Sequence, residues 1–257
     1  MKILAITQAR YGSTRLPAKI LKEVDGMPLL EIHLRRILRS RRISALKIAT
    51  TPEEGSALIV AVADRLGIPS CQGSVDDVLE RFWDTASPEE PDYVVRLTSD
   101  CPLIDPEVID SVIDFAIEGG YDYAATDPAS FPDGLDTEVF RFSALKRAYE
   151  EATLRSEREH VTPYIWKNGS ARGGSLFKSA YKANPAGVYG AENYRITLDE
   201  AEDFEVLSSL IRALGIDRGW KEYIDYLEAN PSLKGVNSRF GYNEGYAKSL
   251  REDAPAK

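Results

Sequence analysis

KILAITQARYGSTRLPAK, residues 2–19, is the stretch that decides the fold. Its first half is a short run of mostly apolar residues, which predicts a strand buried in the middle of a parallel sheet. The chain then becomes a loop that carries the cations Arg10, Arg15 and Lys19. Open α/β sheets bind ligands at the carboxyl ends of such strands, and clustered cations suit a polyphosphate. Three basic residues in a short loop also fit an ordinary solvated surface.

A second strand followed by an acid favours the binding site over the surface loop. Residues 93–97, YVVRL, are again apolar for the most part, and Asp100 follows them closely. A carboxylate beside bound phosphates is what Mg²⁺ requires, because this ion takes one or two carboxylates together with phosphate oxygens. Gly12 and Ser13 would let the backbone of the first loop approach the phosphates.

Residues 8–19, QARYGSTRLPAK, resemble the signature loop of the cytidylyltransferases that activate sugar acids as CMP derivatives, the acylneuraminate and 3-deoxy-manno-octulosonate (Kdo) group. Further motifs are most similar to the SpsF-like branch, which serves spore coat polysaccharide biosynthesis. They lie at 94–105, 132–140 (PDGLDTEVF), 158–164 (REHVTPY), 195–199 (RITLD) and 243–246 (NEGY). The resemblance therefore covers nearly the whole chain.

The resemblance implies a single-domain α/β fold of Rossmann-like nucleotidyltransferase type, the nucleotide-diphospho-sugar transferase type, with a mixed sheet. The domain would span residues 1–250, followed by a flexible tail at 251–257. An excursion at about 127–182 would line the acceptor pocket and help to form a homodimer. The implied reaction transfers CMP from CTP to a sugar acid, nonulosonic or Kdo-like, and releases pyrophosphate for surface polysaccharide biosynthesis. A phosphonate or polyol phosphate acceptor, or a non-catalytic binding subunit on the same fold, are the alternatives.

The candidate site residues follow from the loop, the acid and the resemblance together. The expected catalytic residues are Arg15, Lys19, Asp100 and Asp199, of which Asp100 and Asp199 would hold Mg²⁺. The expected nucleotide-binding residues are Gln8, Ala9, Arg10, Gly12, Ser13, Arg15, Lys19, Thr50, Ser74, Asp77, Arg81 and Asp100. The expected acceptor-binding residues are Asp133, Asp136, Glu138, Arg158 and His160.

Several of these residues also have structural interpretations. Asp199 precedes a helix expected at 200–214 and could simply cap it, and Ser74 or Asp76 could cap the helix that follows residue 76. Arg158 could belong to a salt-bridged surface. A helix over 27–40 would pack His33 near its apolar face and leave its arginines, including Arg36, solvated. Asp105 is expected to cap a helix over 106–118, and a last strand is expected over 194–198.

Composition and missing motifs exclude other classes of protein. The net charge of −9 argues against a nucleic-acid surface, and Cys71 and Cys101 give neither a disulfide framework nor a zinc spacing. No apolar run approaches the roughly 20 residues of a membrane span, and no signal stretch precedes the first strand, so a cytoplasmic protein without membrane contact is expected. The absence of Gly-x-Gly-x-x-Gly and Walker motifs argues against a dehydrogenase or a P-loop kinase.

Overall fold

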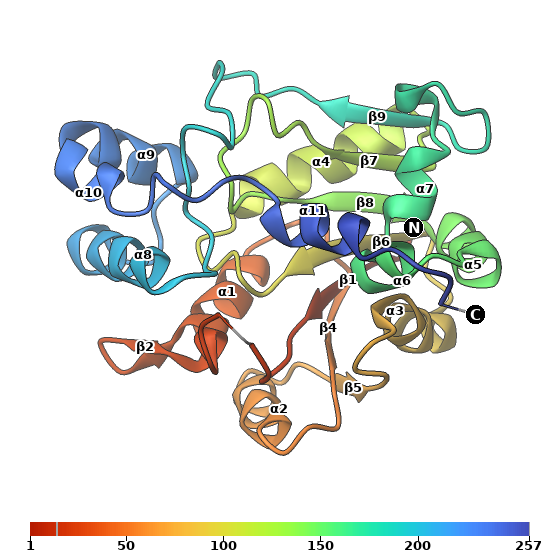
Figure 1. The fold of residues 1–257 in the computed structure, drawn as a ribbon, viewed down its shortest axis with the longest axis horizontal. Helices are drawn as coiled ribbons and strands as arrows, with labels where there is room; N and C mark the ends of the chain where they lie inside the picture. The colour runs from red at the N-terminus through yellow and green to blue at the C-terminus, as the bar shows by residue number, and fades with distance from the viewer. Residues whose placement is uncertain (14, 257) are drawn as a thin grey trace.

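A seven-stranded sheet with strand order β5-β4-β1-β6-β8-β7-β9 forms the centre of the protein (Figure 1). The computed structural model describes residues 1–13 and 15–256. Within the sheet, β8 runs antiparallel to both of its neighbours, β6 and β7, whereas the other pairs are parallel. The structure thus has the mixed sheet that the family resemblance implies.

The strands and helices have the following bounds. The sheet consists of β1 (Ile3–Gln8), β4 (Ala45–Thr50), β5 (Ser70–Gln72), β6 (Tyr93–Thr98), β7 (Tyr123–Thr126), β8 (Glu138–Arg141) and β9 (Ser179–Lys182), and β2 (Glu23–Val24) pairs separately with β3 (Met27–Pro28). The helices are α1 (Leu29–Ile37), α2 (Ser56–Arg65), α3 (Val78–Ala86), α4 (Pro106–Glu118), α5 (Phe142–Glu151), α6 (Arg155–His160), α7 (Pro163–Lys167), α8 (Ala201–Leu214), α9 (Trp220–Ala229), α10 (Pro231–Gly235) and α11 (Glu244–Arg251).

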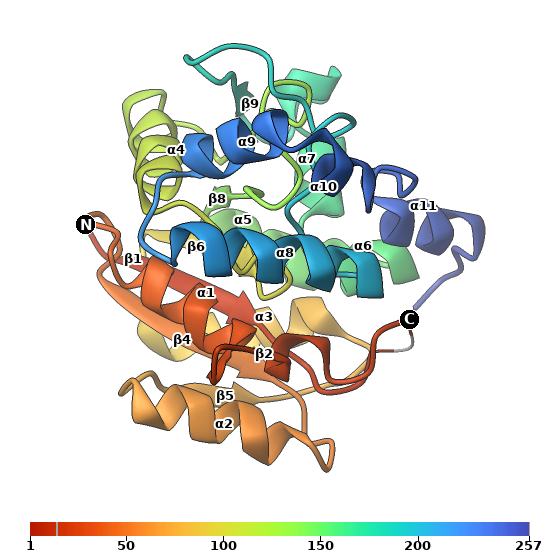
Figure 2. The same cartoon turned by 90° about the vertical axis from the view of Figure 1, so that its left-hand side faces the viewer.

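Helices cover both faces of the sheet because successive side chains of a strand point to opposite sides. In β1, Ile3 and Ala5 pack into one core with residues of α1, α2, α4, α8 and α9. Leu4 and Ile6 pack into a second core with α3, α5 and residues around α7. Figure 2 shows α1, α8 and α9 on the face turned to the viewer. This two-sided burial explains why β1 reads as a continuous apolar run.

The order of the strands reverses next to β1, which pairs with β4 on one side and with β6 on the other. Gln8, the last residue of β1, lies opposite Thr98, the last residue of β6. The loop that leaves β1 and the loop that carries Asp100 therefore start side by side. Such a reversal is where open α/β sheets form their ligand crevice.

Helix α4 confirms its predicted bounds and cap, since Asp105 accepts hydrogen bonds from the backbone N–H groups of Glu107 and Val108. Helix α3 corrects another prediction. Its N-cap is Asp77, which accepts from the N–H of Glu80, rather than Ser74 or Asp76.

Residues 194–198 do not form the predicted strand. Arg195 makes a single bridge to Asp133, and Gly134 then turns the partner chain away with a φ of 109°. A Cβ at position 134 would lie 2.7 Å from the carbonyl carbon of Ile196, so this close approach requires glycine.

Two side chains of α1 are more deeply buried than expected. His33 is fully buried, and its ring bonds to the Thr7 hydroxyl and the Cys101 carbonyl, each at 2.8 Å. Arg36, expected to be solvated, is also buried and donates to the carbonyl oxygens of Ile104 and Arg218. The guanidinium satisfies backbone carbonyls that would otherwise be buried without donors.

The end of the chain, where a flexible tail was predicted, packs against the start of α6. Asp253 accepts hydrogen bonds from the backbone N–H and the hydroxyl of Ser156, at 3.0 and 2.8 Å. The N–H of Arg155 donates to the Ala254 carbonyl, and Pro255 bridges to Leu154. Lys257, the last residue of the predicted tail, lies outside the described residues. Across the described ranges, no helix combines the length and the apolar character that a bilayer span requires.

Candidate functional site

A cleft of about 700 Å³ opens at the carboxyl ends of β1 and β6. Its walls come from the loop after β1, the loop after β6, the excursion and the segment that contains α11. Drug-sized and cofactor-sized ligands occupy cavities of roughly 300–1,000 Å³, so the cleft is large enough for such a ligand. We call the part near the first loop the donor arm and the part lined by the excursion and α11 the acceptor arm.

Lys19 joins the two carboxylates that the sequence assigned to the metal. Its Nζ lies 3.4 Å from Asp100 Oδ2 and 2.8 Å from Asp199 Oδ1, and it also donates to the Leu198 carbonyl at 2.7 Å. Arg15 reaches the same Asp199 oxygen at 2.8 Å. The four expected catalytic side chains are therefore brought together in one cluster.

Backbone hydrogen bonds fix Asp199 beside Asp100. The N–H of Leu198 donates to the Asp100 carbonyl at 2.7 Å, and the Thr197 hydroxyl donates to the same oxygen at 3.1 Å. Asp203, at the start of α8, accepts from the N–H groups of Asp199 and Glu200, each at 2.9 Å. The helix is thus capped by Asp203 and Glu200, and the Asp199 side chain is left to face the cleft.

Arg195 holds Asp203, and with it the segment that carries Asp199, in place through ion pairs. Its guanidinium forms a two-pronged pair with Asp203, with both distances 2.8 Å, and a further contact of 2.8 Å with Asp133. Both carboxylates are buried, and charge-assisted pairs of this bidentate kind are geometrically specific. Asp133, which was expected to bind the acceptor, lines the cleft, but one of its carboxylate oxygens is paired with Arg195.

The pKa values of the cluster reflect mutual stabilisation. Burial alone would lower the pKa of Lys19, but the charges of Asp100 and Asp199 outweigh it and the pKa is raised. Burial would raise the pKa of Asp100, yet the ammonium of Lys19 and a hydrogen bond from Thr98 bring it below its usual value. Both groups are therefore charged near neutral pH.

The cluster fits a magnesium ion that is shared with phosphate. Asp100 and Asp199 both reach a single cationic atom, so their oxygens converge on one point. Within residues 1–13 and 15–256, no group of three or more His, Cys, Asp and Glu side chains is arranged to hold a metal. Mg²⁺ satisfies itself with one or two carboxylates plus phosphate oxygens and water, and two convergent carboxylates meet that requirement.

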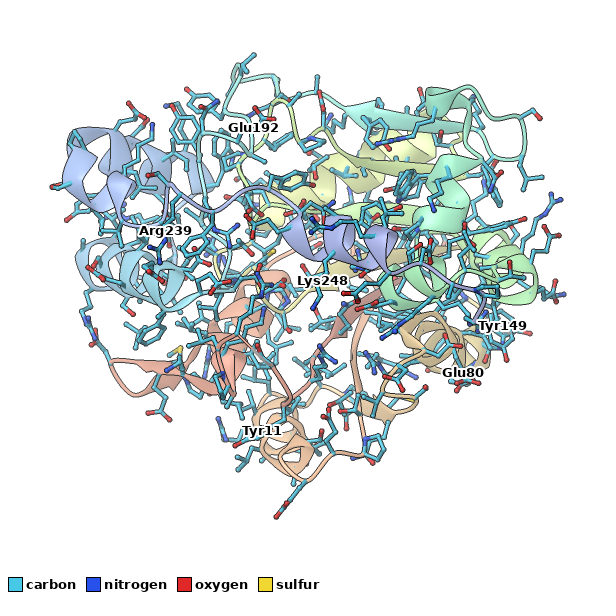
Figure 3. All side chains as sticks on the ribbon, viewed as in Figure 1. Tyr11, Glu80, Tyr149, Glu192, Arg239 and Lys248 are labelled. Atoms are coloured by element: carbon cyan, nitrogen blue, oxygen red, sulfur yellow. The ribbon has the colours of Figure 1, made fainter. Side chains whose placement is uncertain are left out.

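The donor arm contains most of the predicted nucleotide-binding residues. Those that line the cleft are Gln8, Ala9, Arg10, Gly12, Ser13, Arg15, Lys19, Arg81 and Asp100. Figure 3 shows Tyr11, from the same loop, beside α2, where a Cβ at Gly55 would meet its ring. The loop is thereby packed against the start of α2.

Thr50, Ser74 and Asp77 are not among the described residues that line the cleft. Thr50 is fully buried at the end of β4, and the Ser74 hydroxyl accepts from the N–H of Asp77. Asp77 caps α3 and pairs with Arg158 at 2.5 Å. These three side chains therefore do not face the cleft, and the bonds of Ser74 and Asp77 stabilise the segment around the start of α3.

Asp133, Asp136, Glu138 and His160, which the sequence predicts to bind the acceptor, all line the acceptor arm of the cleft. Glu138 is held by Arg96 and accepts hydrogen bonds of 2.6 Å from each of the hydroxyls of Tyr123 and Thr162. Asp136 accepts from the Tyr242 hydroxyl at 3.1 Å. Burial, opposed in part by a hydrogen bond from the Gly134 N–H, raises the pKa of Asp136.

Arg158 corrects one acceptor prediction. It is buried under the cleft wall, where it pairs with Asp77 and donates to the carbonyls of Tyr149 and Ala152, each at 3.2 Å. Its exposed fraction is 3% for the side chain, so a ligand in the cleft does not reach it. Arg158 thus belongs to a salt bridge, which lies inside the protein and not on its surface.

Several further residues line the acceptor arm that the sequence does not predict, and they are mostly aromatic or cationic. They are Arg96, Tyr123, Arg155, Thr162, Trp166, Arg172, Tyr181, Tyr242, Tyr246 and Lys248. Arg96 carried a usable signal, because an arginine within an otherwise apolar strand needs a buried partner. The others come from segments whose convergence only the fold defines.

The strand order, the basic loop and the paired carboxylates define a nucleotidyltransferase type of site. A family model described as cytidylyltransferase matches residues 4–229. The spore coat polysaccharide biosynthesis protein SpsF of Bacillus subtilis is 34% identical over 89% of this chain and 95% of its own length. The chain therefore belongs to the cytidylyltransferase family.

Solved structures agree with this assignment. A cytidylyltransferase from Leptospira borgpetersenii is 32% identical, with a TM-score of 0.83 over 91% of this chain and 96% of that one. A CMP:2-keto-3-deoxy-manno-octonic acid synthetase solved with CTP shares the fold, with a TM-score of 0.60 at 15% identity over 83% of this chain and 99% of that one. The first supports the family and the second the fold.

Proposed function

We propose that this cytidylyltransferase transfers CMP from CTP to a sugar acid, nonulosonic or Kdo-like, and releases pyrophosphate. The observation that carries the proposal is the cluster of Lys19, Asp100 and Asp199 at the mouth of the basic loop. The activity would require Mg²⁺ and would serve surface polysaccharide biosynthesis, as the name of the Bacillus relative suggests.

The side chains of the donor arm would bind and orient the triphosphate. Arg10 and Arg15 offer planar donor groups to phosphate oxygens, and Lys19 offers a compact charge near the α-phosphate. In the structure Arg15 pairs with Asp199 and Glu200, so the incoming phosphates would take over part of these contacts. Mg²⁺, held by Asp100 and Asp199, would neutralise charge that develops on the phosphates. Transfer would then depend on positioning and electrostatics, without a covalent enzyme intermediate.

Cations on the acceptor arm would bind an anionic acceptor. Of the acids that line this arm, Asp133 and Glu138 are paired with Arg195 and Arg96, whereas Asp136, Glu159 and Glu244 form no ion pair with a described residue. Within the described part of the chain, three cations that line this arm have no ion-pair partner, namely Arg155, Arg172 and Lys248. Unpaired cations in a cleft attract a carboxylate, which sugar acids carry and neutral sugars lack.

Pyrophosphate release tests the proposal. The wild-type protein would be incubated with Mg²⁺, with each of CTP, UTP, ATP and GTP, and with a panel of sugar acids, phosphonates and polyol phosphates. We expect turnover with CTP and a sugar acid, and its loss when Mg²⁺ is chelated. Turnover only with a phosphonate or polyol phosphate would replace the proposed acceptor.

The variant Asp100→Asn tests the role of the cluster. It keeps the size of the side chain but removes a charge that the metal and Lys19 share, so we expect turnover to fall by at least about 100-fold. Circular dichroism should show an intact fold. Asp64→Asn is the matched control, because Asp64 lies exposed on α2 and outside the residues that line the cleft. Full activity of the Asp100→Asn variant would refute the assignment.

A further inference from the structure

The end of the chain forms one wall of the acceptor arm. We call residues 242–256 the C-terminal strap. In Figure 1 its helix α11 lies in front of the sheet, between the group α8 to α10 and the pair α6 and α7. Its residues Tyr242, Tyr246 and Lys248 line the cleft, and Figure 3 labels Lys248 near the centre of the view.

The strap is held mainly by polar and aromatic contacts. Helix α11 has no buried residue of its own. Ser249 bonds to His160 Nε2 at 2.9 Å and to Glu159 Oε2 at 3.1 Å, and Asp253 bonds to Ser156. A segment with little buried apolar surface is among the parts of a protein that open most readily. The wall can therefore move without disturbing either core.

The hydroxyl of Tyr246 forms no hydrogen bond with the described part of the protein. Its oxygen is buried, and among the described residues it has no hydrogen-bond partner. The ring packs edge-on against His160 at 5.1 Å and Trp166 at 5.7 Å between ring centroids. A buried polar atom without a partner destabilises the fold. Because Tyr246 lines the cleft while its oxygen is covered, a small shift of the strap would bring the hydroxyl to a ligand that bonds to it.

The neighbours of Tyr246 match a polyhydroxylated anion. Arg172 lies over the Trp166 ring at 4.4 Å and donates to the Tyr181 hydroxyl at 3.2 Å. Burial, followed by the charge of Arg96, lowers the pKa of His160 to about 4. His160 is then neutral near pH 7 and does not supply the positive charge of this wall. Aromatic faces, a tyrosine donor and a guanidinium suit the carbons, hydroxyls and carboxylate of a sugar acid.

We propose that Tyr246 binds the acceptor, donating its hydroxyl to an oxygen of the sugar acid, and that the C-terminal strap is the wall that selects the acceptor. This inference rests on the proposed function, since it names a residue of the same acceptor arm. Tyr246 touches the substrate but takes no part in the transfer of the CMP group. The strap would thus determine which acceptor binds, whereas the loop at the start of the chain would bind the nucleotide.

Tyr246→Phe tests the proposal, because it removes the oxygen and keeps the ring that packs against His160 and Trp166. With the sugar acid that gives the highest turnover, we expect KM for that acid to rise about 10-fold, the loss of one hydrogen bond to a charged or strongly polar group. KM for CTP should stay unchanged, and Tm should not fall, because the deleted hydroxyl has no partner in the protein. Tyr226→Phe is the control, since Tyr226 lies on α9 and outside the residues that line the cleft.

The outcomes separate this inference from the function beneath it. If the wild-type protein turns over a sugar acid and Tyr246→Phe leaves KM for it unchanged, the inference is wrong while the proposed function stands. An equal rise in KM for CTP would also overturn it, because the effect would then not belong to the acceptor arm. If the wild-type protein turns over no sugar acid, the proposed function fails and the inference falls with it.

Discussion

The ammonium of Lys19 lies 2.8 Å from the carboxylate of Asp199, across a separation of 180 residues in the sequence. The first loop and the segment before α8 are therefore joined by charge within the site itself. Because Asp100 shares the same ammonium, the contact holds two acids close together that would otherwise repel each other. The residues that are proposed to bind phosphate thus also organise the carboxylates.

Replacing Lys19 with methionine should impair both activity and stability. The variant keeps the length of the side chain but leaves Asp100 and Asp199 without their shared cation. We expect turnover to fall by at least about 100-fold and the free energy of unfolding at neutral pH to fall by about 1–3 kcal/mol. Urea unfolding and pyrophosphate release measure the two effects. Lys146→Met, at an exposed pair on α5, is the control and should change stability by less than about 0.5 kcal/mol.

The pH dependence of this difference follows from the lowered pKa of Asp100. A carboxylate with a lowered folded-state pKa contributes stability above its unfolded value of about 4 and loses it as the pH falls through the folded value. The stability gap between the wild-type protein and Lys19→Met should therefore narrow below about pH 4. A gap that stays constant on acidification would show that the ion pairs do not cause it.

Arg158 and Asp77 give a prediction about structure rather than binding. Arg158 is buried and Asp77 is partly buried, so removal of the guanidinium takes a hydrogen-bond donor away from the Asp77 carboxylate and from two backbone carbonyls. Arg158→Met should lower the free energy of unfolding by about 2–3 kcal/mol and leave KM for the acceptor unchanged in the folded fraction. The control Arg147→Met breaks an exposed pair with Glu151 and should cost less than about 1 kcal/mol. A selective rise in acceptor KM for Arg158→Met would restore this residue to the acceptor site.

Local signals in the sequence were sufficient for the elements that depend on local chemistry. Asp105 followed by Pro106 predicts both the cap and the start of α4, and the apolar run before Gln8 predicts β1. The first loop and Asp100 could be paired because both follow strands of one sheet. The periodicity of α1 did not predict the burial of Arg36. Its partners include the carbonyl of Arg218, which lies beside α1 only in the folded protein.

The acceptor arm was the least predictable part for the same reason. Arg158 looks like a surface or ligand-binding residue until α6 is seen to place it against Asp77. Tyr246 belongs to a motif that was recognised by resemblance, yet neither its burial nor its missing partner is visible in a sequence. Residues whose role depends on the convergence of distant segments require the fold.

His33 predicts a loss of stability on mild acidification. Its Nδ1 donates to the Cys101 carbonyl, and in the neutral ring Nε2 then accepts from the Thr7 hydroxyl. Burial lowers its pKa to about 4. The unfolded chain, with a histidine pKa of about 6.5, binds the proton first, so this histidine should cost up to about 3 kcal/mol of stability as the pH falls from about 6.5 to 4.

His33→Gln removes the titrating group and so measures how much His33 contributes to the loss of stability on acidification. Urea unfolding over roughly pH 7 to 4.5 should show a shallower loss of stability for the variant than for the wild-type protein. His160, whose pKa is also lowered to about 4, contributes with the same sign and remains in the variant. Parallel pH profiles for the two proteins would mean that His33 is already protonated in the folded state, or that it becomes so without cost.

Arg10 predicts a separation of binding from stability. It lines the donor arm and has no ion pair among the described residues, and its charge adds to burial in lowering the pKa of Arg81 to about 10. Two neighbouring guanidinium groups repel each other until an anion lies between them. Arg10→Ala should therefore raise KM for CTP by about 10-fold or more, and it should leave Tm unchanged or slightly higher. The control is Arg41→Ala, which removes an exposed arginine outside the cleft and should leave both values unchanged. A lower Tm with an unchanged KM for CTP would mean that Arg10 stabilises the loop and does not bind the nucleotide. The repulsion between the two arginines destabilises the free protein, so a binding role requires that phosphate relieves this repulsion.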